Sequence, residues 1–169
     1  MRLFFALLPD TALRAALGER ALALARRIGG RAVPAANLHL TAAFLGDLDA
    51  ARATALATIG AALAVDPFTL TLDTIGEWHH AGVAWIAPSV VPPPLVALHA
   101  RLAAALAGAG FAVESRPFRP HVTLVRRRAR PLADAACAPL DWRVERVALM
   151  VSERAGGALR YRDITPRPA

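Results

Sequence analysis

The chain has 169 residues, of which 56% are hydrophobic, and this is enough for one buried core of ordinary domain size. All twenty basic residues are arginine and thirteen residues are acidic, so the net charge is +7 without any lysine. The missing lysine excludes a Walker A loop, Schiff-base chemistry and the lysyl-nucleotide intermediate of ATP-dependent ligases. Arginine suits phosphate oxygens and therefore an RNA or nucleotide partner, although biased codon usage explains the charge equally well.

No stretch of the chain is apolar for long enough to be a signal peptide or a membrane span. We therefore expect a soluble, cytoplasmic protein without a membrane partner, in which residues 1–169 form a single two-lobed domain and a monomer. The single cysteine, Cys137, excludes an internal disulfide and a thiolate zinc site, and its sequence context indicates a small buried or half-buried residue.

The first half of the chain alternates strands with helices. The pattern predicts, in order, a buried strand over 2–8, a helix that opens at Pro9–Thr11 and stops at Gly29, a strand over 37–46, a helix capped by Asp47 or Asp49 that ends near Ala64, and a strand over 68–78.

The second half repeats this logic. It predicts a turn over 79–82, a strand over 83–88, a helix over 95–110 led by three prolines, a strand over 121–127, an irregular stretch over 129–140, and strands over 142–153 and 159–165 around Gly156–Gly157. About seven strands and three helices in this order indicate an α+β fold with mainly antiparallel sheet.

A His-apolar-Thr unit occurs in two of the predicted strands, as His39-Leu40-Thr41 and as His121-Val122-Thr123. Side chains two apart share one face of a strand, so each unit places an imidazole beside a hydroxyl. The intervening residue points into the core, together with Leu38, Phe44 and Leu124. An internal duplication, or a pseudo-symmetric arrangement of two lobes, would bring the two units face to face.

Two facing histidines suit proton transfer on both sides of a phosphorus centre. One neutral imidazole takes the proton of the attacking water and one imidazolium protonates the departing alkoxide, because the ordinary histidine pKa of about 6.5 leaves both forms available. The threonine hydroxyls would donate to the non-bridging phosphate oxygens, and no metal or cofactor is required.

The sequence resembles the two-histidine (2H) phosphoesterase superfamily, and within it the bacterial and archaeal RNA 2′,3′-cyclic phosphodiesterases once called 2′-5′ RNA ligases. The resemblance rests on "MRLFFALLP", "VPAANLHLTAAFLGDLD", "RPFRPHVTLVR" and "VALMVSERAGGALRY". It implies two pseudo-symmetric lobes with helices outside and an active-site cleft between them. It further implies catalytic His39 and His121, phosphate-binding Thr41, Thr123 and Arg126, and cofactor-free hydrolysis of a 2′,3′-cyclic phosphate on RNA, tRNA fragments included, to a 2′-phosphate.

Arg126 poses a geometric difficulty, because strict alternation along its strand places it on the face opposite His121. Either the strand twists or bulges there, or the arginine reaches the phosphate around the strand end, or it only lines the rim.

Several other features have two interpretations. Trp78 and Trp85 can stack a nucleobase or belong to the core, and His99 is interpreted as a surface or satisfied core histidine. His79 and His80 indicate a loop at the cleft edge rather than a metal site. The run of arginines at 126–130 is an RNA-backbone patch or a solvated charge run.

The alternatives in function are a phosphodiesterase for a smaller cyclic nucleotide or a 2′-5′ oligonucleotide, and a non-catalytic RNA-binding module. RNA ligation would be the reverse of the same chemistry, weak and independent of ATP.

Overall fold

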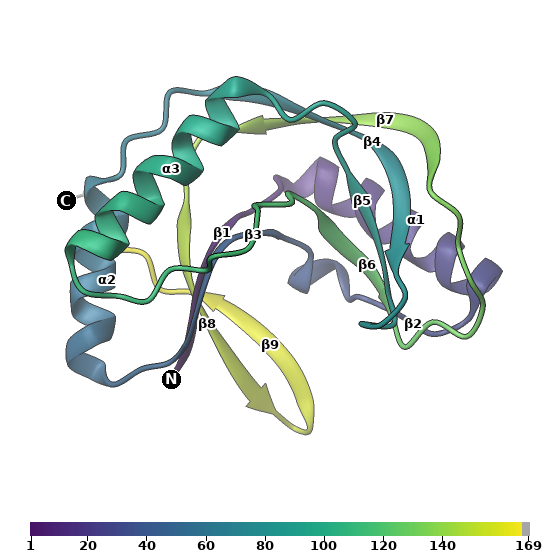
Figure 1. Cartoon of the computed structure of the whole chain (residues 1–169). Helices are drawn as coiled ribbons and strands as arrows, with labels where there is room; N and C mark the ends of the chain where they lie inside the picture. Colours follow the sequence, from purple (N-terminus) through teal and green to yellow (C-terminus); the bar gives the residue numbers. More distant parts are fainter. Residues whose placement is uncertain (167–169) are drawn as a thin grey trace.

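A computed structural model describes residues 1–166, apart from the side chains of Ala155 and Ala158; the last three residues of the predicted domain lie outside this range. In the described chain, antiparallel strands form one long, strongly bent sheet, and three α-helices pack against it (Figure 1). The elements are β1 (Arg2–Leu7), α1 (Thr11–Ile28), β2 (Arg31–Ala32), the 3-10 helix η1 (Ala35–Asn37), β3 (Leu40–Asp47), α2 (Ala50–Ala62), β4 (Phe68–Trp78), β5 (Val83–Ala87), α3 (Pro93–Gly108), β6 (Val122–Arg126), β7 (Ala135–Val144), β8 (Ala148–Ala155) and β9 (Ala158–Asp163).

The strand order, β7-β4-β5-β6-β3-β1-β8-β9, divides the sheet into two four-stranded halves, and the short β2 pairs with β6. We call β3, β1, β8 and β9 with α2 and α3 the first lobe, and the remaining strands with α1 the second lobe. The lobes meet where β3 pairs with β6 through one residue pair, Leu40 and Val122. Helix α1 contacts β6 and β7, whereas α2 contacts β8 and α3 contacts β3. This arrangement confirms the predicted α+β fold with two pseudo-symmetric lobes.

Local sequence signals account for the helix boundaries. Asp10 Oδ1 accepts a hydrogen bond from the Leu13 amide at 2.8 Å, and Asp49 Oδ1 does the same for Arg52 at 2.8 Å. Of the two predicted caps for the second helix, Asp49 is therefore the one used. Helix α1 ends at Ile28 and is capped by Gly29, whose φ of 75° lies in the left-handed region that favours glycine.

One core of apolar side chains runs through both lobes. It contains Leu17 of α1, Leu56 of α2 and Leu102 of α3, and also Leu40 and Val122 at the junction of the lobes. All five side chains are fully buried. The strand residues between the histidine and threonine of each motif are therefore core residues, as predicted. None of the described helices has the length and apolarity needed to cross a bilayer.

The predicted secondary structure was wrong over residues 129–153. The stretch over 129–140 is not wholly irregular, because β7 begins at Ala135, and the predicted strand over 142–153 is divided between β7 and β8 at residues 145–147. Strand β7 lies at the edge of the sheet and pairs with β4 through an irregularity in register opposite Asp73. An edge position tolerates Pro139, which would be excluded from a central strand, and this explains why its composition hid the strand.

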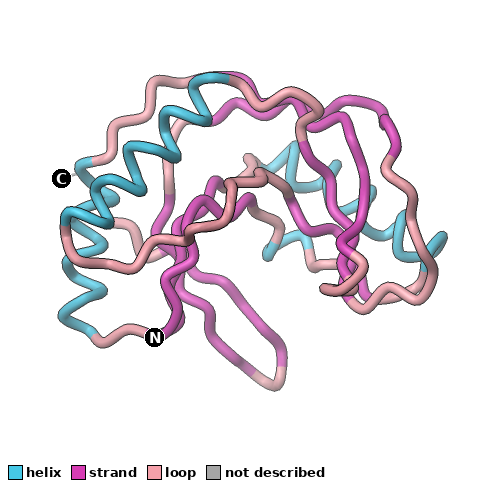
Figure 2. Tube along the Cα trace, viewed as in Figure 1, coloured by secondary structure: helices cyan, strands magenta, loops and turns pink. Residues whose placement is uncertain are grey.

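The connection from α3 to β6, residues 109–121, is long and mostly irregular. Figure 2 shows it as a loop that leaves the end of α3 and runs across the molecule to β6. It ends at His121, so it delivers the second histidine to the boundary between the lobes. Strand β2 and helix η1 form the connection that leads to His39 in the other motif, and both were absent from the sequence prediction.

Candidate active site

The two His-x-Thr motifs lie side by side at the junction of the lobes. The antiparallel pairing of Leu40 with Val122 brings the flanking residues next to one another, His39 alongside Thr123 and Thr41 alongside His121. Each histidine immediately precedes its strand, β3 or β6. A single backbone pair thus assembles two imidazoles and two hydroxyls from motifs that are far apart in sequence.

His39 is held by its own backbone and by two aromatic rings. Its Nδ1 donates to the Asn37 carbonyl at 2.7 Å, and its Nε2 lies 3.0 Å from Thr41 Oγ1. A carbonyl can only accept, so Nδ1 carries the hydrogen and Nε2 of the neutral ring is the basic nitrogen. The rings of Phe4 and Tyr161 each lie 5.0 Å from the imidazole, centroid to centroid.

The buried side chain of Asn37 ties this arrangement to the last strand, because its Nδ2 donates to the Leu159 carbonyl of β9 at 2.8 Å.

His121 is held in the same way from the other lobe. Its Nδ1 donates to the Arg119 carbonyl at 2.8 Å. Arg119 lies two residues before His121, just as Asn37 lies two residues before His39. Trp78 of β4 packs edge-on against the imidazole with centroids 4.2 Å apart. Both histidines therefore have the same tautomer, in which Nε2 is the basic nitrogen; that of His39 accepts a hydrogen bond from Thr41 Oγ1. The sequence could not show which tautomer each histidine adopts, because the acceptors of the Nδ1 hydrogen bonds are main-chain carbonyls.

Both imidazoles favour the neutral form in the absence of a ligand. Burial is the main cause and lowers the pKa of His39, and the nearby charges of Arg126 and His121 lower it further, against the hydrogen bond to Asn37. Burial and the Arg126 charge likewise lower the pKa of His121, against the hydrogen bond to Arg119. A bound phosphate would offset the Arg126 charge, so an anionic ligand promotes protonation of the pair.

A β-bulge resolves the position of Arg126. Opposite β5, Val83 pairs with Arg126 and Ala84 with Val125, but Trp85 pairs with Thr123, which leaves Leu124 without a partner. The extra residue shifts the alternation by one: Leu124 and Val125 are both fully buried, and Arg126 returns to the face of Thr123. Of the alternatives open from the sequence, the bulge is the one that the structure contains.

The same bulge occurs in the first motif and corrects the prediction for Phe44. Ala6 pairs with Thr41 and Phe5 with Ala43, so Ala42 is the extra residue. Phe44 is consequently 51% exposed instead of lying in the core. It follows Thr41 by three residues, as Arg126 follows Thr123. Periodicity assigned it to the core because a bulge leaves no signal in the hydrophobic pattern.

Two adjoining pockets meet at these motifs. The smaller, of about 260 Å³, is lined by His39, Thr41, His121, Thr123 and Arg126, together with Trp78 and neighbouring apolar residues. The structure thus places all five predicted site residues around one pocket.

The larger pocket, of about 490 Å³, shares Thr41, Trp78 and His121 with the smaller one. It continues to Phe44, Phe118 and Arg116, none of which the sequence singled out as a site residue. His99 forms part of its wall and stacks on Phe118 with ring centroids 3.9 Å apart; burial lowers the pKa of this histidine. The larger pocket therefore offers aromatic surface next to the polar one.

The remaining candidate residues lie outside the two pockets. Trp85 packs across Gly76, where a β-carbon would come within 2.5 Å of its ring. His79 and His80 are exposed, and His79 Nδ1 accepts from Arg128 Nη2 at 2.8 Å. Cys137 is partly buried near Arg20, and burial raises the pKa of its thiol. Within residues 1–166, no three His, Cys, Asp or Glu side chains form a group suited to a metal ion.

Comparison with known sequences decides the family. The sequence profile of the 2′-5′ RNA ligase superfamily matches residues 9–156, which include both motifs. The chain belongs to the 2′-5′ RNA ligase superfamily. Two members of similar sequence are named RNA 2′,3′-cyclic phosphodiesterase. The one from Escherichia coli is 36% identical over 137 residues, covering 78% of this chain and 76% of that protein. The one from Thermus thermophilus is 32% identical over 163 residues, covering 90% and 82%.

Solved structures of the superfamily share the fold. The crystal structure of E. coli LigT complexed with 3′-AMP superposes with a TM-score of 0.81 at 32% sequence identity, and the match covers 96% of this chain and 94% of that one. Both lobes are therefore part of the similarity.

Proposed function

We propose that this member of the 2′-5′ RNA ligase superfamily hydrolyses the 2′,3′-cyclic phosphate at the end of an RNA to a 2′-phosphate. The observation that carries the proposal is the matched pair of imidazoles. His39 and His121 line one pocket, and each directs Nδ1 to a main-chain carbonyl, so that Nε2 is the nitrogen able to exchange a proton with the substrate. The names of the E. coli and T. thermophilus relatives support the substrate class. RNA as the substrate also fits the cytoplasmic location predicted from the sequence.

In the proposed reaction, one histidine acts as general base and the other as general acid. The neutral imidazole accepts the proton of a water whose oxygen forms a bond to phosphorus. The P–O3′ bond breaks, and the imidazolium gives its proton to O3′. Each proton transfer is typically worth about 10² to 10⁴ in rate. A 5′-hydroxyl in place of water would join two RNAs through a 2′-5′ bond by the same transfers, without ATP.

Thr41, Thr123 and Arg126 would hold the phosphate while its charge is redistributed. The two hydroxyls donate single hydrogen bonds, whereas the arginine offers a planar pair of donors that matches two phosphate oxygens. The bulge in β6, which puts Arg126 on the same face as Thr123, supports this role. The adjoining larger pocket, with the exposed ring of Phe44, would take the nucleoside.

The test is a product assay on an RNA oligonucleotide that ends in a 2′,3′-cyclic phosphate, with and without EDTA. We expect a 2′-phosphate product in both conditions, because the proposed proton transfers and phosphate contacts use imidazoles and hydroxyls and need no metal ion. His39→Ala and His121→Ala should each slow turnover by at least about 10²-fold while RNA binding survives. His80→Ala, an exposed histidine outside the pockets, is the matched control.

Activity lost in EDTA and restored by a divalent ion would refute the metal-independent mechanism. Parental turnover in either active-site histidine variant would refute the acid-base pair. If RNA binding, and not turnover, collapses in these variants, the chain is a binding module.

A further inference from the structure

Arginines without a carboxylate partner gather at one end of the second lobe. Among the described residues, five arginines form ion pairs within 4.0 Å, at positions 116, 128, 143, 146 and 162. The other exposed arginines within residues 1–166 have no such partner there, and six of them lie around the end of β6 and the end of α1. We call this group the arginine face; it consists of Arg26, Arg27, Arg31, Arg126, Arg127 and Arg130.

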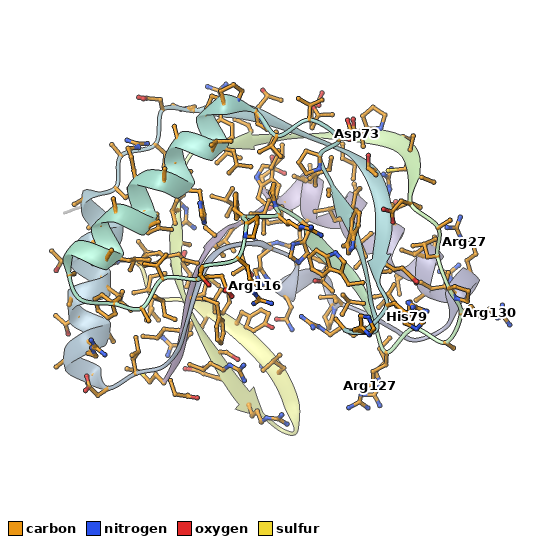
Figure 3. All side chains as sticks on the ribbon, viewed as in Figure 1. Arg27, Asp73, His79, Arg116, Arg127 and Arg130 are labelled. Carbon is orange, nitrogen blue, oxygen red and sulfur yellow. The ribbon has the colours of Figure 1, made fainter. Side chains whose placement is uncertain are left out.

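Main-chain contacts join the two parts of the chain that carry these six residues. Arg31 of β2 pairs directly with Arg126 of β6. The amides of Ala129 and Arg130 both donate to the carbonyl of Ile28, at 3.2 and 2.8 Å, so the segment after β6 is seated on the end of α1. Figure 3 shows Arg27, Arg127 and Arg130 at this end of the molecule, away from Arg116.

The backbone is built for this close approach. A β-carbon on Gly30 would lie 2.7 Å from the Arg126 carbonyl oxygen and 2.8 Å from that of Arg127, so only glycine fits. Arg127 itself adopts a φ of 53°, a left-handed conformation that non-glycine residues rarely take. The fold therefore holds cationic residues close together and accepts a strained backbone there.

Stability alone does not account for this arrangement. Arg26 and Arg27 lie in the last turn of α1, where positive charge favours the helix dipole. That explanation does not extend to Arg31, Arg126 or Arg127, which lie in strands or after them and repel one another. Like charges held together in one place favour a partner that carries many negative charges.

On this basis we infer that the arginine face binds the sugar-phosphate backbone of the RNA body, beyond the nucleotide whose end is opened. The inference rests on the proposed function. It follows from continuity, because Arg126 belongs both to the phosphate pocket and to the face. A 2′,3′-cyclic phosphate is the last group on its strand, so any other phosphate on this face comes from the body of the RNA. Arginine binds phosphate through two parallel hydrogen bonds and reads no sequence there.

The experiment compares two substrates of different length. Arg26→Gln, Arg27→Gln and Arg130→Gln are combined in one variant, since none of these side chains lines the catalytic pocket. With an RNA hairpin that ends in a 2′,3′-cyclic phosphate, we expect KM to rise at least about tenfold and the slope of log KM against log salt to fall by roughly 2 to 3. Turnover of 2′,3′-cyclic AMP, which has no RNA body, should not change.

The control variant removes the same charge elsewhere, by Arg101→Gln, Arg143→Gln and Arg154→Gln, and should keep the parental KM for the hairpin. Arg31→Gln combined with Arg127→Gln, outside α1, separates phosphate binding from an effect on the helix end and should also raise KM. Thermal melting checks that each variant is folded.

Binding of the hairpin carrying a terminal 2′-phosphate is measured in parallel by fluorescence anisotropy. This binding measurement tests the arginine face independently of catalysis. If no substrate is turned over, the proposed function is refuted, and the binding data still decide whether the arginine face contacts RNA. Parental affinity for RNA in both arginine-face variants, or an equal loss in the control, would overturn the inference.

Discussion

Loss of the Arg128 side chain should destabilise the protein strongly, because it leaves a largely buried carboxylate without its cation. The Arg128 and Glu77 side chains form an ion pair and are only 6% and 14% exposed. Arg128 Nη2 donates to Glu77 Oε1 at 2.9 Å, and Glu77 Oε2 also accepts from the Leu132 amide at 2.9 Å. The pair therefore fastens the segment after β6 to the end of β4.

The proposed change is Arg128→Met, which keeps the aliphatic part of the side chain. Removing one partner of a buried pair costs about 3 to 5 kcal/mol, since the desolvated charge of Glu77 loses its compensation. At roughly 2 to 4 °C per kcal/mol for a chain of this size, the melting midpoint should fall by roughly 6 to 20 °C. Urea unfolding with linear extrapolation gives the free energy of unfolding directly.

A second substitution shows whether the unpaired charge is the cause. Glu77→Gln in the Arg128→Met background removes that charge but keeps an oxygen for the Leu132 amide, so it should restore part of the lost stability. Arg116→Met is the matched control, because the Arg116–Glu114 pair is on the surface, with 82% and 50% exposure, and its loss should leave the midpoint essentially unchanged. A loss in Arg128→Met no greater than in Arg116→Met would refute the reasoning.

Three further predictions concern the site. Burial lowers the pKa of His39 and His121 in the folded state, so the unfolded chain binds more protons below about pH 6.5. The free energy of unfolding should therefore be level above that pH and fall between that pH and the lower folded-state pKa values. The fall should be shallower in His39→Gln/His121→Gln; an equally steep fall would assign it to other groups. Thr41→Val and Thr123→Val should each lower kcat/KM roughly 10- to 150-fold, the equivalent of one hydrogen bond to charge at about 1.5 to 3 kcal/mol, whereas full activity would remove that threonine from the phosphate site. Arg126→Gln should lower kcat/KM more than either threonine change. It should also raise the apparent pKa of the acidic limb of the pH–rate profile, because the Arg126 charge lowers the pKa of both histidines; an unchanged apparent pKa would contradict that coupling.

Much of the fold could be predicted because its signals are local. Helix α1 is capped by Asp10 at its start and Gly29 at its end, two residue types whose capping role can be recognised in the sequence. The partition of Leu40 into the core and Thr41 onto the open face follows from the period of a strand and required no tertiary information. The edge strand β7 could not be predicted, because its pairing with β4 overrides a composition with little strand propensity.

The site divides along the same line. By itself, the sequence identified the candidate side chains for the chemistry, since an imidazole and a hydroxyl two residues apart share a face in an extended strand. Only the tertiary structure decided that His39 and His121 line one pocket, through a single residue pair between β3 and β6. It also decided that Arg126 and Phe44 turn outward, because an extra residue, Leu124 in β6 and Ala42 in β3, follows each motif, and its place is set by pairing with the neighbouring strand. Strand pairing is a long-range interaction, and a pattern read along one strand contains no information about it.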